Sequence, residues 1–377
     1  MKKSWILIGT ALFLFVGLGP WAKAMEEEEN LDLLYEGLYQ TIGGEDFDKA
    51  IPDDISENLP SSVAAAPDLA ARLFSLRGFV NLASGGLYRI LRSCLSDFSK
   101  VFLLVLFAVL GNALIDALQA DFAAPAVRFC MVLSLAGASF EVLSENYLYC
   151  ERVIQEAASL LEVMIPLLAA AGLAAGRSLS ATLLPASVST GIALFASFNR
   201  SAFLPMLQLY FALAVASAAS GVSSLSSICK FFHKILLFSL GFSATLMSGL
   251  LTLQKTVAAA ADNVATDAAK FALDSVIPVV GSILTDALGT VLGCIRALRT
   301  SIGAVGIFVI LMLMLPVAIR VLLQSQLFQL AATFGGLFGE SRTLEFFHSI
   351  ASVWSMLAAV TICQGVYLIT ATALLAA

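Results

Sequence analysis

Long apolar runs separated by short polar stretches dominate the chain from residue 101 onward. Eight of these runs are close to the roughly 20 residues that a helix needs to cross a bilayer. They cover residues 101–119, 123–143, 157–176, 202–221, 235–254, 277–295, 302–323 and 350–375. A weaker run at 180–198 contains Pro185, and it is either a full span or a re-entrant segment shielded by protein. The pattern predicts an all-α, polytopic membrane helix bundle with about 6–9 spans over residues 101–377.

Composition supports a membrane class. The chain is 59% hydrophobic and 13% charged, with a mean hydropathy of +0.91. A soluble domain is about 45–50% apolar and about 25% charged. A water-soluble fold could not bury this much apolar surface, so the composition excludes an ordinary globular protein.

The first 24 residues have the organisation of a signal peptide. Lys2 and Lys3 form a positive region, residues 5–18 form a short apolar region, and Ala-Lys-Ala at 22–24 fits an A-x-A cleavage site. An uncleaved first membrane helix is the alternative. Because the acidic stretch MEEEEN follows at once, we expect cleavage and a mature N-terminus outside the cytoplasm.

Residues 25–71 form an acidic extracytoplasmic arm. They hold 13 acidic residues and one lysine, a net charge of −12, whereas residues 72–377 have a net charge of +3. Apolar positions recur in the arm at helical spacing: Leu31, Leu34, Tyr35, Leu38 and Ile42. The arm is either a solvating tail or a segment that docks onto a partner through this face.

Residues 72–100 are predicted to form an amphipathic, membrane-proximal helical region. Arg89 and Arg92 lie on a polar face, opposite an apolar face that contains Leu91 and Leu95. Such a helix can lie among lipid headgroups, or it can pack beside the membrane domain. The sequence leaves both alternatives open.

Carboxylates inside apolar runs are the first candidates for function. Asp116, Glu162 and Asp286 lie within predicted spans, where an ionised carboxylate costs at least a few kcal/mol. Such buried polar groups face a bundle interior or a water-filled path, unless they lie at a span end and contact headgroups. They make a channel or a transporter a hypothesis to test.

Small residues indicate close packing between helices. Gly172 and Gly176 form one GxxxG pair, and Gly289 and Gly293 form another. Glycine lets two helix backbones approach where lipid offers no hydrophobic drive for association. The pairs favour a multi-helix assembly.

The sequence lacks the motifs of catalytic chemistry. It has no GxxxxGK[ST] phosphate loop, no GxSxG, no HExxH and no CxxC. Its two histidines, His233 and His348, are far apart, and its six cysteines are scattered. We therefore expect no enzyme activity, no cofactor, no metal site and no nucleic-acid partner.

A polar stripe precedes the run at 277–295. At 100° per residue, Asp267, Lys270 and Asp274 fall on one narrow face of a helix. Pro278 then removes a backbone donor and disfavours helix at the residue before it, while Gly281 permits a tight re-entry. The pattern predicts a broken helix that contributes to a conduit or a subunit interface. A surface helix followed by an ordinary span is the alternative.

The continuation of this stripe carries a family resemblance. The stretch AAKFALDSVIPVVGSILTDALGTVLGC, residues 268–294, closely resembles the most distinctive block of the stage III sporulation protein AE family. The resemblance extends over nearly the whole chain and is strongest over residues 255–325. It implies that the block above, including Asp286, Gly289 and Gly293, contributes to the family's function.

The resemblance implies a role in endospore formation. Family members are expected in the mother-cell membrane around the forespore, as multi-pass subunits of a secretion-like channel that supports late forespore gene expression. The expected partners are other membrane proteins of the same complex, a separate ATPase subunit, a forespore membrane protein and membrane lipid. A stand-alone secondary transporter with buried carboxylates is the alternative, although no inverted repeat between the two halves is visible.

Overall fold

The computed structural model describes residues 124–220, 223–276, 281–337 and 341–376, together with scattered residues between 37 and 117. The helices are α3 (Gly44–Ala50), α7 (Ala124–Ala174), α8 (Ser178–Phe198), η2 (Asn199–Phe203), α9 (Leu204–Ser220), α10 (Ser223–Val276), α11 (Gly281–Leu337) and α12 (Ser341–Ala376). The signal peptide at 1–24, most of the acidic arm, most of the amphipathic region and Asp116 lie outside the described residues.

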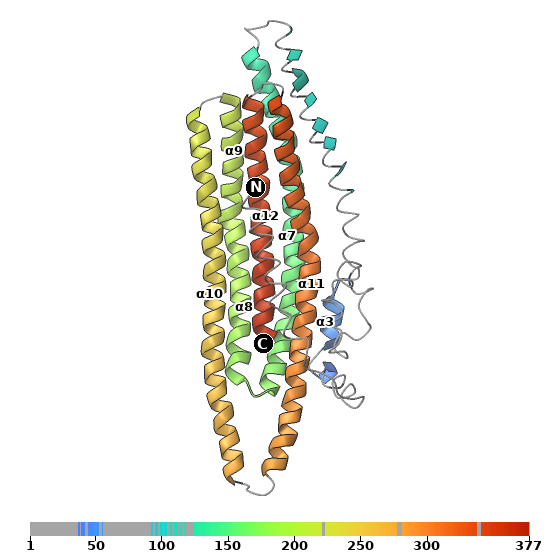
Figure 1. Ribbon diagram of the computed structural model, residues 1–377, viewed down its shortest axis with the longest axis vertical. Helices are drawn as coiled ribbons and strands as arrows, with labels where there is room; N and C mark the ends of the chain where they lie inside the picture. The colour runs from blue at the N-terminus through green and yellow to red at the C-terminus, as the bar shows by residue number, and fades with distance from the viewer. Residues whose placement is uncertain are drawn as a thin grey trace.

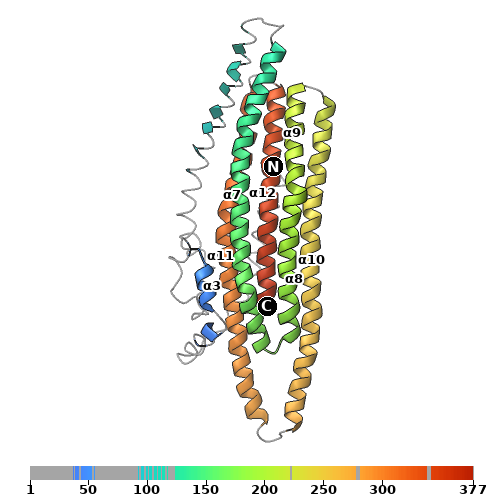
Figure 2. The ribbon, with the colours of Figure 1, turned by 180° about the vertical axis from the view of Figure 1, so that it is seen from behind.

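Five long rods lie side by side in an up-and-down bundle (Figures 1 and 2). They are α7, the continuous α8–η2–α9 rod, α10, α11 and α12. Each contains a segment long and apolar enough to cross a membrane: Phe129–Ala174, Ala181–Ser220, Ser227–Val257, Ile295–Phe334 and Glu345–Ala376. The described chain is therefore an all-α membrane protein with five candidate spans. This confirms the class of fold predicted from sequence.

Among the described residues, neighbouring apolar runs that were predicted as separate spans join into single helices, whereas the predicted run at 101–119 lies partly outside those residues. The runs at 123–143 and 157–176 both lie on α7, and those at 277–295 and 302–323 both lie on α11. The 51 residues of α7 make a helix about 77 Å long. Each of these pairs of predicted spans therefore lies on one helix, which contains one candidate span.

The weak apolar run at 180–198 is also part of a longer helix. It lies on α8, which continues through Pro185 and η2 into α9. In η2 the N–H of Leu204 donates to the carbonyl of Asn199, five residues earlier. This wider turn directly precedes Pro205, whose ring and missing N–H disturb a regular α-helix. The segment is therefore a full-length helix and not a re-entrant one.

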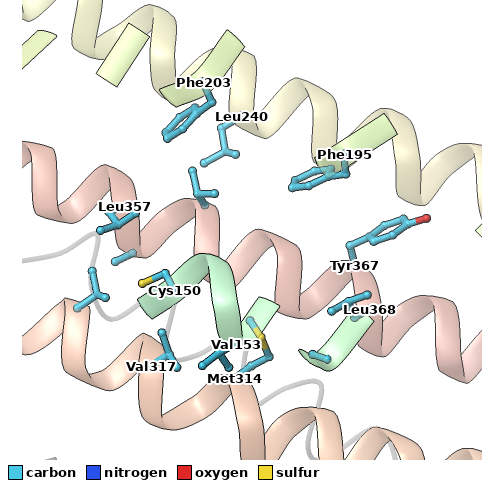
Figure 3. Packing of buried hydrophobic residues seen from close by; sticks show 14 of the residues in the cluster. Cys150, Val153, Phe195, Phe203, Leu240, Met314, Val317, Leu357, Tyr367 and Leu368 are labelled. Carbon is cyan, nitrogen blue, oxygen red and sulfur yellow. The ribbon is translucent and has the colours of Figure 1, made fainter. Parts of the chain in front are cut away.

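The last helix, α12, lies at the centre of the bundle. It packs most extensively on α11 and also contacts α7, α8, α9 and α10. Its buried residues include Phe346, Phe347, Trp354, Leu357 and Leu368, which lie on one face of the helix. The opposite side keeps an exposed strip that includes Glu345, His348 and Val366. Figure 3 shows side chains from the surrounding rods converging on Leu357, Tyr367 and Leu368.

Glycines bring the rods close together. A Cβ atom at Gly172 would lie 3.1 Å from the Cβ of Ala181, so α7 and α8 approach closely there. Gly176 has a different role from the one expected of a packing pair: it adopts a φ of 79° and ends α7. The N–H of Arg177 donates to the carbonyl of Gly172 at 2.9 Å, which is the bond that closes a Schellman cap.

Candidate functional site

The α10–α11 hairpin carries the polar stripe predicted from sequence. Both helices extend beyond the adjacent ends of α7, α8 and α12 (Figures 1 and 2). Asp267, Lys270 and Asp274 lie on the last turns of α10, which ends at Val276. Pro278 lies outside the described residues, and the chain resumes as a helix at Gly281. The break predicted at Pro278 therefore stays a prediction.

The remaining predicted residues of the block lie on α11. The structure describes the backbone of Asp286 and Gly289 as helical but not their surroundings, so their predicted roles stay predictions. Gly293 is exposed, and no described atom lies within 4 Å of a Cβ built at this position. Gly293 therefore makes no close helix contact within the described chain. The close packing predicted from the GxxxG pair at Gly289 and Gly293 stays a prediction.

Glu162 is not buried, and this corrects the prediction for that residue. Its neighbours Leu160, Leu161 and Met164 lie in the core with exposures of 0–1%, whereas Glu162 is exposed. The reason is the helical rotation of 100° per residue, which directs Glu162 outward when Leu161 points inward. Pro166, one turn later, is exposed on the same side.

Glu162 belongs to a longer polar surface, which we call the α7 acidic face. It consists of the exposed residues Glu141, Glu145, Arg152, Gln155, Glu156, Ser159 and Glu162. Their angular positions fall within about 120° of one another on a helix. The face extends over about 32 Å, from residue 141 to residue 162, along a helix that is also a candidate membrane span.

A polar layer lies midway along the bundle, and we call it the upper polar layer. Arg200 forms an ion pair with Glu151 at 2.7 Å. The amide of Asn199 donates to Oε1 of Gln364 at 2.6 Å, and the guanidinium carbon of Arg320 lies 5.1 Å from the ring centre of Tyr149. The layer therefore links α7, η2, α11 and α12. It was not predicted from sequence, although Asn199 and Arg200 interrupt an apolar stretch.

A second polar layer, the lower polar layer, lies nearer the hairpin. The buried guanidinium of Arg299 donates to the carbonyl of Leu375 from Nε at 2.8 Å and also from Nη2. Arg177 and Asp262 are close enough to act on the charge of Arg299, and Lys255 is close to both arginines. Three cations and one carboxylate, from the turn before α8, from α10 and from α11, therefore meet at this level.

Among the described residues, no group of three His, Cys, Asp or Glu side chains could hold a metal ion. The cysteines that the structure describes, Cys130, Cys150, Cys229 and Cys363, are not in disulfides. The features with chemical character are the two polar layers, the α7 acidic face and the hairpin. Together they define a multi-pass α-helical membrane protein with a polar surface along one span.

The family follows from comparison with known proteins. The family model Stage III sporulation protein AE (spore_III_AE) matches residues 79–377. The chain therefore belongs to the stage III sporulation protein AE family, and the resemblance seen in residues 268–294 is confirmed.

A curated relative agrees with this assignment. Stage III sporulation protein AE of Bacillus subtilis (strain 168) is 25% identical to the chain over 233 residues. The alignment covers 61% of this chain and 58% of that protein, so the chain spans somewhat more than half of its relative's length. No solved structure matches the chain.

Proposed function

We propose that this chain is a membrane subunit of a multi-protein, secretion-like channel that links mother cell and forespore during endospore formation. It would reside as a multi-pass protein in the mother-cell membrane around the forespore and support late forespore gene expression. The observation that carries the proposal is the family match over residues 79–377. Five candidate membrane helices support it, because a channel subunit in this position must cross a bilayer.

The proposed role is that of a non-enzymatic conduit or scaffold. The sequence has no phosphate loop, so energy would come from a separate ATPase subunit. The other proposed partners are further membrane proteins of the same complex, a forespore membrane protein and lipid. No cofactor and no nucleic acid enter the proposal. Purified protein is accordingly expected to show no saturable ATP binding.

Two surfaces suit this role. The α7 acidic face offers carboxylates along a helix that is otherwise apolar enough to span a membrane, and such groups are usually directed at protein or at a water-filled path. The α10–α11 hairpin extends beyond the bundle and carries the charged stripe of Asp267, Lys270 and Asp274. The transporter alternative has lost one of its supports, because Glu162 lies on the outside of the bundle and not within it.

A charge exchange on the hairpin tests the proposal. Lys270→Glu would place three like charges within about two helical turns, and if the stripe meets a partner the repulsion should stop sporulation after engulfment. Adding Asp274→Lys restores one pair of opposite charges and should recover part of the activity. A stripe that faces bulk water would lose only about 0.5 kcal/mol.

The measurement is the yield of heat-resistant spores, together with a late forespore reporter and an immunoblot of the membrane fraction. Lys230→Glu is the matched control, since it makes the same change at an exposed lysine near the opposite end of α10. Wild-type yield from Lys270→Glu would remove the hairpin from the proposed interface. A block in sporulation at normal protein level, relieved by the second change, would support it.

A further inference from the structure

The apolar part of the bundle is about twice as long as a bilayer is thick. The candidate span Ile295–Phe334 has 40 residues, which make about 60 Å of helix, against about 30 Å of hydrocarbon. Tilting cannot account for this difference in length. A helix of about 60 Å would fit into about 30 Å of hydrocarbon only at a tilt of about 60°, and membrane helices tilt by about 20° within a range of 0–40°. Only half of the apolar length can therefore lie in lipid.

Charged residues mark which half this is. Three stretches without charged residues are each bounded by cations at both ends: residues 178–199 between Arg177 and Arg200, residues 235–254 between Lys234 and Lys255, and residues 300–319 between Arg299 and Arg320. Their lengths of 20–22 residues correspond to about 30 Å. Lysine and arginine at the ends of a membrane helix reach out to the headgroups with their long side chains.

The structure gathers five of these six cations at two levels of the bundle, whereas Lys234 lies farther out, because its neighbour His233 packs on Tyr210. Arg177, Lys255 and Arg299 meet in the lower polar layer. At the other end, Arg200 pairs with Glu151 and Arg320 lies over Tyr149. Because Glu151 and Tyr149 are two residues apart on α7, Arg200 and Arg320 reach that helix at nearly the same level.

The half of the bundle above the upper polar layer is less suited to lipid. Three of its helices carry charged residues there: Glu141 and Glu145 on α7, Lys230 and Lys234 on α10, and Glu345 on α12. Between the two layers, by contrast, the exposed charged side chains among the described residues, other than those at the boundaries, come from α7 alone, as Glu156 and Glu162.

We propose that lipid acyl chains cover the outward faces of α8 and α10 between the two polar layers, and that the rest of the bundle projects out of the membrane on both sides. The surfaces in question are apolar and exposed, with Leu194 on α8 and Leu250 on α10 among them. The α7 acidic face is not part of the lipid-covered surface. On one side α9 and the adjoining ends of α7, α10, α11 and α12 project, and on the other the α10–α11 hairpin does. This placement does not depend on the proposed channel function.

Matched positions on one rod test the placement. Leu194 and Leu209 have similar exposures, 51% and 48%, and lie on either side of Arg200. In the full chain with its native cysteines replaced by alanine, Leu194→Cys and Leu209→Cys would each carry a nitroxide label after reconstitution into phosphatidylcholine–phosphatidylglycerol vesicles. Collision with oxygen reports acyl chains, and collision with a water-soluble nickel chelate reports water.

At position 194 we expect oxygen collisions to exceed nickel collisions, and at position 209 we expect the reverse. A second pair, Leu250→Cys and Phe231→Cys on α10, provides an independent measurement should one pair perturb the fold, with 250 in lipid and 231 in water. Oxygen-dominated collisions at both 209 and 231 would overturn the proposal, because the bilayer would then cover the upper half. Nickel-dominated collisions at both 194 and 250 would overturn it as well.

Discussion

The outward faces of α7 and α10 differ sharply although both helices belong to one bundle. Exposed positions on α10 are apolar over many turns: Phe238, Phe242, Leu246, Leu250 and Leu253. Exposed positions on α7 over a similar length carry Glu141, Glu145, Glu156 and Glu162. A carboxylate at the bilayer centre costs about 2.5–3.5 kcal/mol on insertion scales, whereas leucine and phenylalanine are favourable there.

The difference indicates that the bundle has two sides with different surroundings. The α10 side suits lipid, and the α7 side needs water or protein. Part of the α7 side is already covered within the chain, because α3 packs against α7 with Phe47 fully buried. Four experiments test this difference between the α10 and α7 sides of the bundle.

The largest effect is expected from a charge on the α10 side. Leu250→Arg places a cation where the proposed lipid contact lies and should cost about 2.5–3.5 kcal/mol near the centre of a span. The amount of protein in the membrane fraction should fall strongly. Phe231→Arg is the control, since it adds the same charge on α10 beyond the upper polar layer and should leave the amount close to wild type. Equal losses from both variants would contradict the contrast between the two positions.

A change on the α7 side should separate function from insertion. Glu162→Lys keeps a charge at an exposed position, so the protein should accumulate normally. If a partner or a water-filled path meets the α7 acidic face, the reversed charge should lower spore yield at unchanged protein level. Glu162→Gln is the milder companion variant and should retain more activity. Unchanged yield from Glu162→Lys would detach this face from the proposed channel.

A smaller effect is expected in the upper polar layer, where the two sides are joined. Asn199→Leu removes the donor to Gln364 and leaves a partly buried amide oxygen without that bond, which costs about 1–3 kcal/mol. The melting temperature of the purified protein in detergent should fall. Combining it with Gln364→Leu replaces both polar partners and should recover part of the loss. Additive losses would show that the hydrogen bond is not what these residues contribute.

The smallest effect concerns the contact between α3 and α7. The hydroxyl of Tyr39 donates to Oδ1 of Asp48 at 2.9 Å, and burial raises the pKa of Asp48 although this hydrogen bond opposes the rise. A carboxyl whose pKa is raised in the packed state favours packing at low pH and loses that contribution as the pH rises through the raised pKa. Packing of α3 against α7 should therefore tighten as the pH falls from neutral to about 4, near the ordinary pKa of an aspartate side chain.

A nitroxide at the exposed position Lys49 would report this change as reduced mobility in acid. Asp48→Asn is the control, because it cannot titrate and should make the mobility independent of pH over that range. Mobility that increases in acid in the chain that retains Asp48 would contradict the expected tightening.

Apolar periodicity was sufficient to predict the class of fold but not which apolar runs share one helix. Residues 123–143 and 157–176 satisfy the length of a span separately, and only the continuous α7 shows that the polar residues between them are helical. Asn199 and Arg200 indicate a loop by composition, yet a π-helical turn carries the chain through them. In both cases polar residues end an apolar run without ending the helix.

Some features of the candidate site could be predicted from the sequence and others could not. The outward direction of Glu162 was available from sequence, because Leu160, Leu161, Met164 and Leu168 lie on the opposite side of a helix with 100° per residue. The partners in the upper polar layer were not available, because Asn199 and Gln364 are 165 residues apart.

The central position of α12 has a consequence for how the protein is made. Of the described rods this helix comes last along the chain, yet it contacts every other rod. Chains grow from the N-terminus at about 5–20 residues per second, so four rods are synthesised before the one that holds them together. Until the ribosome has made α12, the inner faces of α7, α8, α9 and α11 have no partner at the centre of the bundle. The decisive packing step of this bundle therefore waits for its last described rod.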